Sequence, residues 1–224
     1  MELGNIITGM ERDSSKERKK LEDELFTHKC IYPLAWEDFC QILSTNANNI
    51  LLKRGFTHHF EIDNANQDII YQLYLYFIGD SACKWNIHAG IIFAGKVGCG
   101  KTLLMMAYIL LANSMARKQI TIYHANELCD FVREKGIKEI DRKPLFVDEL
   151  GREPEEVVDF GNVKKPIVEL LAKRYECGAR TYATTNFKIP TLEEKYSQYI
   201  VSRLQEMCNY ILIPGDSRRL INQI

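Results

Sequence analysis

The chain has 224 residues, 46% of them hydrophobic, which suits one α/β domain with a short additional region. The formal charge of −1 excludes a global basic field for nucleic acid, although it allows a local basic patch. No apolar run approaches the roughly 18 residues of a membrane span, and seven widely spaced cysteines without a Cys-x-x-Cys pair indicate reduced thiols and a cytoplasmic protein.

The first part of the chain is expected to be a small helical region. Between Trp36 and Leu51 apolar residues recur at steps of three and four, which predicts an amphipathic helix. Its apolar face either packs on the domain that follows or docks a partner protein, and the sequence leaves both open. We expect residues 1–55 to bind a partner and residues 56–224 to form the main domain.

After a short extended piece at Phe60–Asp63 and a helix that ends near Gly79, apolar strands alternate with helices. This alternation predicts a parallel sheet covered by helices on both faces, with ligands at the carboxyl ends of the strands. The expected strands are Gly90–Ala94, Ile120–His124, Leu145–Asp148, Thr181–Thr184 and Tyr210–Ile213. The expected helices between them are Lys101–Arg117, Glu127–Lys135, Lys164–Tyr175 and roughly Leu192–Met207.

A glycine-rich turn follows the first of these strands and opens the next helix, in the order that a P-loop requires. Glycines let backbone amides approach phosphate oxygens, and the helix N-terminus adds a partial positive charge. Lys101 would reach the β- and γ-phosphates, and the Thr102 hydroxyl would join a Mg²⁺ shell. An ordinary glycine turn is the alternative, but the complete pattern favours nucleotide binding by Gly95, Lys96, Val97, Gly98, Cys99, Gly100, Lys101, Thr102 and the adjoining Leu103.

Two carboxylates end the expected strand at Leu145–Asp148. A strand that ends in two carboxylates, with one other strand between it and the P-loop, is the Walker B arrangement. Asp148 would hold Mg²⁺, and Glu149 would orient and polarise the attacking water. The alternative is a buried strand with an acidic end. A GTPase is disfavoured because no Asn-Lys-x-Asp stretch occurs and because a glutamate directly after the aspartate suits ATP hydrolysis better.

Further polar residues lie toward the C-terminus. Asn186 ends a strand and is a candidate to hold the γ-phosphate or the attacking water, or it is simply a turn residue. Arg203 is a candidate arginine finger for the ATP of a neighbouring subunit, or a surface ion-pair arginine. Arg218 and Arg219, after the last strand, either face phosphate within the same subunit or form a basic tail.

Taken in order, these motifs resemble the AAA+ ATPases of the DnaC and IstB type. The resemblance covers roughly residues 60–221 and implies a five-stranded ASCE sheet with ATP bound between neighbouring subunits. It places Phe60–Asp63 where a linker lines the adenine pocket. The chain ends just past the last strand, so the helical lid of larger AAA+ proteins is expected to be missing, and any DNA-contacting insertion between Lys118 and Leu145 must be small. By position, Lys101 and Thr102 match the Walker A pair, Asp148 and Glu149 the Walker B pair, Asn186 sensor 1, Arg203 the trans-acting arginine and Arg219 sensor 2.

The resemblance implies an ATP- and Mg²⁺-dependent ATPase that associates with itself through the ATP site. A DnaC-like loader of a replicative helicase is our first hypothesis, with direct DNA contact left open and no membrane role. An IstB-like transposition helper acting on duplex DNA is the second hypothesis. A non-hydrolysing nucleotide-binding scaffold is an alternative of another class, and a small-molecule phosphotransferase fits poorly because no arginine-rich lid is evident.

Overall fold

The computed structural model describes residues 34–115, 119–159 and 162–218, and its centre is a parallel sheet of five strands. The strand order is β2-β3-β6-β1-β7, so β6 lies between β3 and β1. Every residue of β1 and β6 is buried, as expected for strands that helices cover on both faces. The predicted sheet is confirmed, with bounds of β1 Gly90–Ala94, β2 Thr121–His124, β3 Leu145–Asp148, β6 Thr181–Thr185 and β7 Cys208–Leu212.

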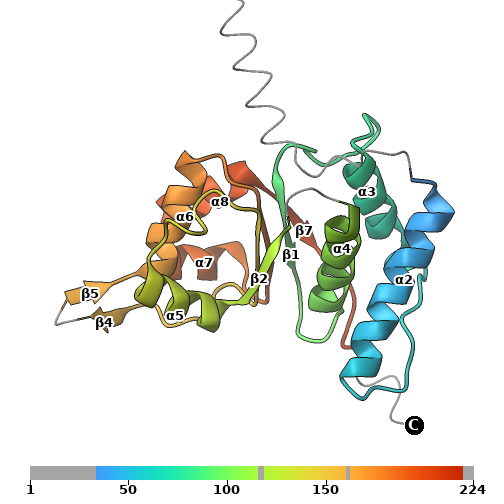
Figure 1. Cartoon of the computed structure of the whole chain (residues 1–224), viewed down its shortest axis with the longest axis horizontal. Helices are drawn as coiled ribbons and strands as arrows, with labels where there is room; N and C mark the ends of the chain where they lie inside the picture. The colour runs from blue at the N-terminus through green and yellow to red at the C-terminus, as the bar shows by residue number, and fades with distance from the viewer. Residues whose placement is uncertain (1–33, 116–118, 160–161, 219–224) are drawn as a thin grey trace, which may run out of the picture.

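Two helical layers cover the sheet, because alternate strand residues point to opposite faces. Ile91 and Phe93 pack with one group of helices, and Ile92 packs with the other. In Figure 1 the first group lies on the right of the sheet and the second on the left. The first group is α2 Trp36–Lys53, α3 Gln67–Ile78 and α4 Lys101–Met115, and the second is α5 Ala125–Lys135, α6 Pro166–Glu176, α7 Ile189–Tyr196 and α8 Gln198–Met207.

Two details of the predicted elements are wrong. The single helix expected near 192–207 is two helices, α7 and α8, because Ser197 between them has a φ of +76°, which a continuous helix does not allow. A hairpin of β4 (Val157–Asp159) and β5 (Asn162–Lys164) precedes α6, which therefore begins at Pro166 rather than at 164. Strands this short carry too little alternation to be recognised.

The apolar face of α2 is covered by the core of the same chain. Phe39, Leu43 and Ala47 are fully buried, and the Asn46 side-chain amide donates to the carbonyl of Ala107 in α4 at 3.2 Å. Residues 1–33 lie outside the described residues, so a partner-binding role for residues 1–55 stays a prediction. Within the described part of the chain, no helix combines the length and apolar character needed to cross a membrane.

Arg174 of α6 is a fully buried cation at the N-terminal end of β6, which is the end of the sheet opposite the P-loop. Its Nε donates to Thr181 Oγ1 at 3.0 Å and its Nη2 to the carbonyl of Arg180 at 2.7 Å, while Nη1 donates to the carbonyls of Ile140 and Lys143. Burial lowers the pKa of the guanidinium to about 10, so it stays charged at neutral pH. Neutral carbonyl and hydroxyl acceptors thus surround a desolvated charge.

We predict that Arg174→Ala lowers the free energy of unfolding by roughly 3–5 kcal/mol, because it leaves a cavity and several buried acceptors without donors. Urea unfolding followed by circular dichroism measures the change. Arg133→Ala is the matched control, since that arginine is half-exposed on α5 and pairs with the surface carboxylates of Asp130 and Glu134. A loss for Arg174→Ala no larger than that of the control would contradict a structural role for this buried arginine.

Candidate active site

The P-loop joins β1 to α4 through backbone conformations that favour glycine. Gly98 has a φ of +87°, and a Cβ there would lie 2.3 Å from Ser217 Oγ. Gly95 has a φ of +153°, and a Cβ there would lie 2.7 Å from the carbonyl oxygen of Ile213. The loop therefore passes close under the segment that follows β7, and larger residues at these two positions would displace it.

Lys101 begins α4 and is only 6% exposed. Its ammonium donates to the carbonyls of Gly95 at 2.9 Å and Lys96 at 2.7 Å, and it lies 3.8 Å from Cys99 Sγ. Burial lowers the pKa of this lysine, while the nearby site carboxylates favour its charged form. The loop thus folds around a buried cation, which is the group that the P-loop pattern assigns to phosphate binding.

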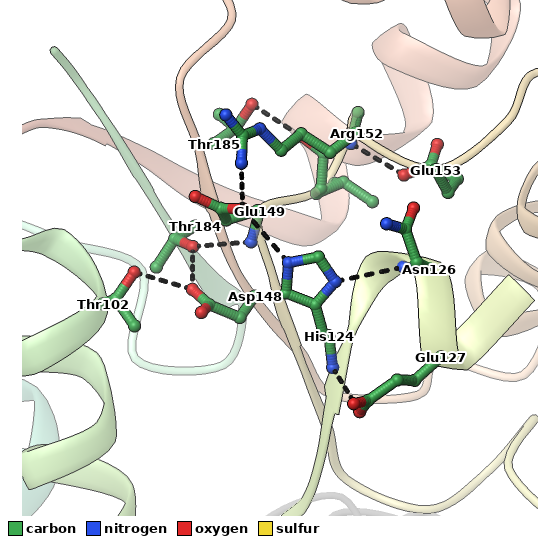
Figure 2. A network of polar contacts seen from close by, with 12 residues as sticks. Thr102, His124, Asn126, Glu127, Asp148, Glu149, Arg152, Glu153, Thr184 and Thr185 are labelled. Carbon is green, nitrogen blue, oxygen red and sulfur yellow. Dashed lines mark hydrogen bonds and ion pairs between the residues drawn. The ribbon is translucent and has the colours of Figure 1, made fainter. Parts of the chain in front are cut away.

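Thr102 and Asp148 meet where β1 and β3 end. Thr102 Oγ1 donates to Asp148 Oδ1 at 2.8 Å, and Thr184 Oγ1 at the end of β6 donates to the same oxygen at 2.5 Å (Figure 2). A hydroxyl and a carboxylate at this spacing are hard oxygen ligands, which suit Mg²⁺. No group of three or more metal-ligating side chains occurs among the described residues. That fits Mg²⁺ in a phosphate site, where it takes one or two protein oxygens together with phosphates and waters.

Glu149 follows directly, in a left-handed conformation with φ of +58°. Its N–H donates to Thr184 Oγ1 at 2.9 Å, and its Oε2 lies 3.1 Å from His124 Nε2 and 2.8 Å from Arg152 Nη1 (Figure 2). Burial raises the pKa of this carboxyl, but the hydrogen bonds from His124 and Arg152 outweigh it and hold the pKa below its ordinary value. The side chain is therefore ionised at neutral pH, as a general base must be.

His124 and Arg152 are site residues that sequence reasoning missed. The N–H of Asn126 donates to His124 Nδ1 at 3.3 Å, so the neutral ring carries its proton on Nε2 and donates it to Glu149. His124 ends β2 and pairs in register with Asp148, and Arg152 lies three residues after Glu149. His124 reaches this position because β2 pairs with β3, which the sequence does not reveal. Its place at the end of an expected strand was nevertheless a signal that could have marked it as a candidate site residue.

We predict that Arg152→Ala raises the pKa of Glu149, because the carboxylate loses a hydrogen bond and a positive neighbour. More of the carboxyl then holds a proton at a given acidic pH, so the acid limb of the predicted ATP hydrolysis, plotted against pH, moves to higher pH. Phosphate release measured across pH tests this, with Arg133→Ala as a control that leaves the profile unchanged. An acid limb that stays in place, or that moves to lower pH, would show that Arg152 does not tune Glu149.

Asn186 lies where the sequence predicted. It follows β6 directly, and β6 runs between β3 and β1, which are the two strands that carry the Walker motifs. The backbone on either side ties β6 to both neighbours: Gly95 N–H donates to the carbonyl of Thr185, and Leu150 N–H donates to that of Thr184. Asn186 thus lies at the carboxyl end of the sheet, between the residues Gly95 and Glu149 that follow the neighbouring strands. A role for its side chain stays a prediction.

Of the two arginines in the predicted site, Arg203 is not in this cluster. Arg203 lies on α8, and its guanidinium stacks on the rings of Tyr199 at 4.0 Å and Tyr175 at 4.7 Å. Arg219 lies outside the described residues. Its neighbour Arg218 does reach the P-loop: its N–H donates to the carbonyl of Gly98 at 3.0 Å.

Arg218 also closes an apolar pocket beside the P-loop. Its guanidinium makes a two-point ion pair with Asp63, with Nη2–Oδ1 at 3.1 Å and Nη1–Oδ2 at 3.0 Å. This ion pair joins the Phe60–Asp63 linker to the segment that follows β7, and the pocket lies between these two segments. Phe60 of the linker lies in the wall of this pocket, and binding of the adenine there stays a prediction. The other lining residues are Ala65, Asn66, Ile69, Cys99, Gly100, Leu103, Leu104, Ile213, Pro214 and Arg218.

Comparison with solved structures identifies the fold. A DnaC helicase loader superposes with a TM-score of 0.55 at 18% identity over 70% of this chain and 94% of that one. The fold is that of the DnaC-type AAA+ proteins. A candidate primosome component from Streptococcus pyogenes serotype M3 gives a TM-score of 0.54 at 18% identity, covering 70% of this chain and 84% of that one. DnaI gives 0.52 at 20% identity, covering 88% of this chain and all of that one. No protein-family model matches the sequence, and no curated protein matches it.

This result confirms the resemblance stated from the motifs, as a likeness to DnaC-type proteins in fold. Identities of 18–20% carry the shared architecture and no more. The activity must therefore be argued from the geometry of the site.

Proposed function

We propose that this chain is an ATPase that binds ATP with Mg²⁺ and hydrolyses it. One observation carries the proposal: the 2.8 Å contact between Thr102 Oγ1 of the P-loop and Asp148 Oδ1 at the end of β3. This contact supports a combined phosphate and metal site, because a P-loop hydroxyl and a carboxylate of β3 meet there. The ionised carboxylate of Glu149 is the next residue along the chain, which supports the proposal that Glu149 is the base beside the γ-phosphate.

Each site residue has a role in the proposed reaction. Lys101 and the P-loop amides bind the β- and γ-phosphates, and Thr102 and Asp148 hold Mg²⁺, which when bound neutralises charge that develops on the phosphates. Glu149 orients the attacking water and accepts its proton. Asn186, between the two Walker strands, positions that water or the γ-phosphate. The apolar pocket between Phe60 and Arg218 takes the adenine.

The ATPase would serve a DNA replication machine, as a loader of a replicative helicase. The similar folds include a protein described as the DnaC helicase loader and another described as a candidate primosome component, which supports this reading. The near-neutral net charge favours a protein partner over a long nucleic-acid surface. Residues 1–55 would supply the surface specific to that partner.

The partner assignment is tested by size-exclusion chromatography of the full chain with a hexameric replicative helicase, with and without ATP and magnesium. A loader co-elutes with the helicase in a nucleotide-dependent manner. ATP-dependent filaments on duplex DNA, seen by electron microscopy with no helicase complex, would instead assign the chain as a transposition helper.

Arg203 is predicted to act on the ATP of a neighbouring subunit. Its guanidinium stacks on Tyr199, whose side chain is largely exposed on α8, and this surface position supports action in trans. Arg203→Ala should lose turnover by roughly 10³-fold, as arginine fingers do. Mixing Arg203→Ala with Lys101→Ala should restore phosphate release, because one subunit then supplies an intact P-loop and the other an intact arginine. A mixture no more active than either variant alone would exclude the trans role.

A further inference from the structure

Glu153 is a buried acidic residue that the proposed reaction does not use. It is 2% exposed and lies in the loop between β3 and β4, four residues after Glu149. Its Oε2 accepts a hydrogen bond from the N–H of Gly151 at 2.9 Å, so the side chain folds back onto the loop that precedes it (Figure 2). A carboxylate in this position is costly to bury unless it is paired, so its partners matter.

The other partners of Glu153 come from α7. The hydroxyl of Tyr196 donates to Glu153 Oε1. Lys195 Nζ donates to the backbone carbonyl of Glu153 at 2.6 Å and lies 3.9 Å from Oε1. Burial, and then the adjacent Glu153 carboxylate, raises the pKa of the Tyr196 phenol, which therefore remains a donor. Glu153 thus ties the loop to the last turn of α7 by three contacts.

The same loop is fixed to β6 on its other side. Leu150 N–H donates to the carbonyl of Thr184 at 2.8 Å, and Thr185 Oγ1 donates to the carbonyl of Leu150 at 2.8 Å. Gly151 has a φ of +103°, and a Cβ there would lie 2.5 Å from a ring carbon of Phe187. The residues next to Glu149 are therefore fixed between β6 and α7, and the contacts on the α7 side are those that Glu153 makes with Lys195 and Tyr196.

Glu149 needs such a hold because its own conformation is unfavourable. A φ of +58° in a residue other than glycine is unfavourable and persists only where the surroundings over-determine it. We propose that Glu153 is a positioning residue for hydrolysis. By accepting hydrogen bonds from the Gly151 N–H and the Tyr196 hydroxyl, Glu153 keeps the backbone of Glu149 in this conformation and the carboxylate of Glu149 directed at the attacking water. The inference rests on the proposed ATPase function.

The test compares Glu153→Ala, Glu153→Gln and Tyr196→Phe with the wild-type chain, in kcat for ATP hydrolysis and in the dissociation constant for a fluorescent ATP analogue. Glu153→Ala should lose about 100-fold in kcat, as an ångström-scale displacement of a catalytic group does. Its affinity for the analogue should stay near that of wild type, because the P-loop is untouched. Glu153→Gln should recover most of kcat, since its amide oxygen still accepts from Gly151, and Tyr196→Phe should fall between the two.

Tyr76→Phe is the matched control. Tyr76 is as buried as Tyr196, and its hydroxyl donates to the carbonyl of Ala89 on the other face of the sheet. A merely structural role for Glu153 predicts losses of melting temperature without a specific loss of kcat, as in Tyr76→Phe. If Glu153→Ala does not fold, Glu153→Gln and Tyr196→Phe decide: wild-type kcat in Tyr196→Phe would overturn the proposal.

Hydrogen exchange separates this inference from the ATPase assignment. In Glu153→Ala the amides of residues 149–152 should exchange faster than in wild type, whether or not the chain hydrolyses ATP. Unchanged exchange there would overturn the positioning role of Glu153. Faster exchange in Glu153→Ala, with no phosphate release from wild-type protein, would instead overturn the proposed function and leave the hold on the loop established.

Discussion

Lys101→Ala is expected to abolish nucleotide binding, with a dissociation constant for ATP at least about 100-fold weaker than that of wild type. The ammonium is desolvated inside the P-loop, and a hydrogen-bonded charge in such a place contributes about 2–5 kcal/mol to binding a charged partner. Its loss also removes the donor to the carbonyls of Gly95 and Lys96, so the loop becomes less ordered. Both effects weaken binding.

Isothermal titration calorimetry with ATP and magnesium measures this effect. Lys173→Ala is the control, because it removes an equal charge from an exposed ion pair on α6. Circular dichroism melting of both variants shows whether the fold persists. ATP affinity near the wild-type value in folded Lys101→Ala protein would refute the assignment of the P-loop as the phosphate site.

Glu149→Gln is expected to keep ATP binding and lose turnover by roughly 10²–10⁴-fold, the range that a positioned general base contributes. Glutamine keeps the shape and the hydrogen bond from Arg152 but cannot accept a proton from water. Because Thr102 and Asp148 are unchanged, the phosphate and metal contacts remain. Binding and turnover should therefore separate in this variant, whereas Lys101→Ala loses both.

Phosphate release and the affinity for a fluorescent ATP analogue are measured on the same preparation. Glu127→Gln is the matched control, since that carboxylate lies in the same region and accepts from the backbone N–H of His124 rather than contacting Glu149 or Asp148. Hydrolysis at the wild-type rate in Glu149→Gln would rule out Glu149 as the base. Loss of binding in parallel with turnover would show that the residue serves structure or affinity instead.

The parts of this site that could be predicted are those carried by residues close together in the sequence. The P-loop from Gly95 to Thr102 joins a strand to a helix within one stretch, and its spacing determines which groups face the phosphates. Asp148 and Glu149 come directly after three buried apolar residues of β3, so the end of the sheet at which they lie follows from the strand direction. These features needed no knowledge of the strand order.

Residues that enter the site through the tertiary arrangement could not be assigned in the same way. His124 reaches Glu149 only because β2 pairs with β3, and Thr184 reaches Asp148 only because β6 lies between β3 and β1. Glu153 looks like one of several acidic loop residues until its burial is known. For α2, helical periodicity predicted an apolar face, but only the fold shows that α4 covers it.

The most direct test of the central claim is a crystal structure of the full chain with a non-hydrolysable ATP analogue and magnesium. We predict that the γ-phosphate lies beside Lys101, that the metal lies between Thr102 Oγ1 and Asp148, and that the adenine occupies the pocket between Phe60 and Arg218. A P-loop free of the analogue at saturating concentration, or an analogue bound away from Asp148 and Glu149, would contradict the account.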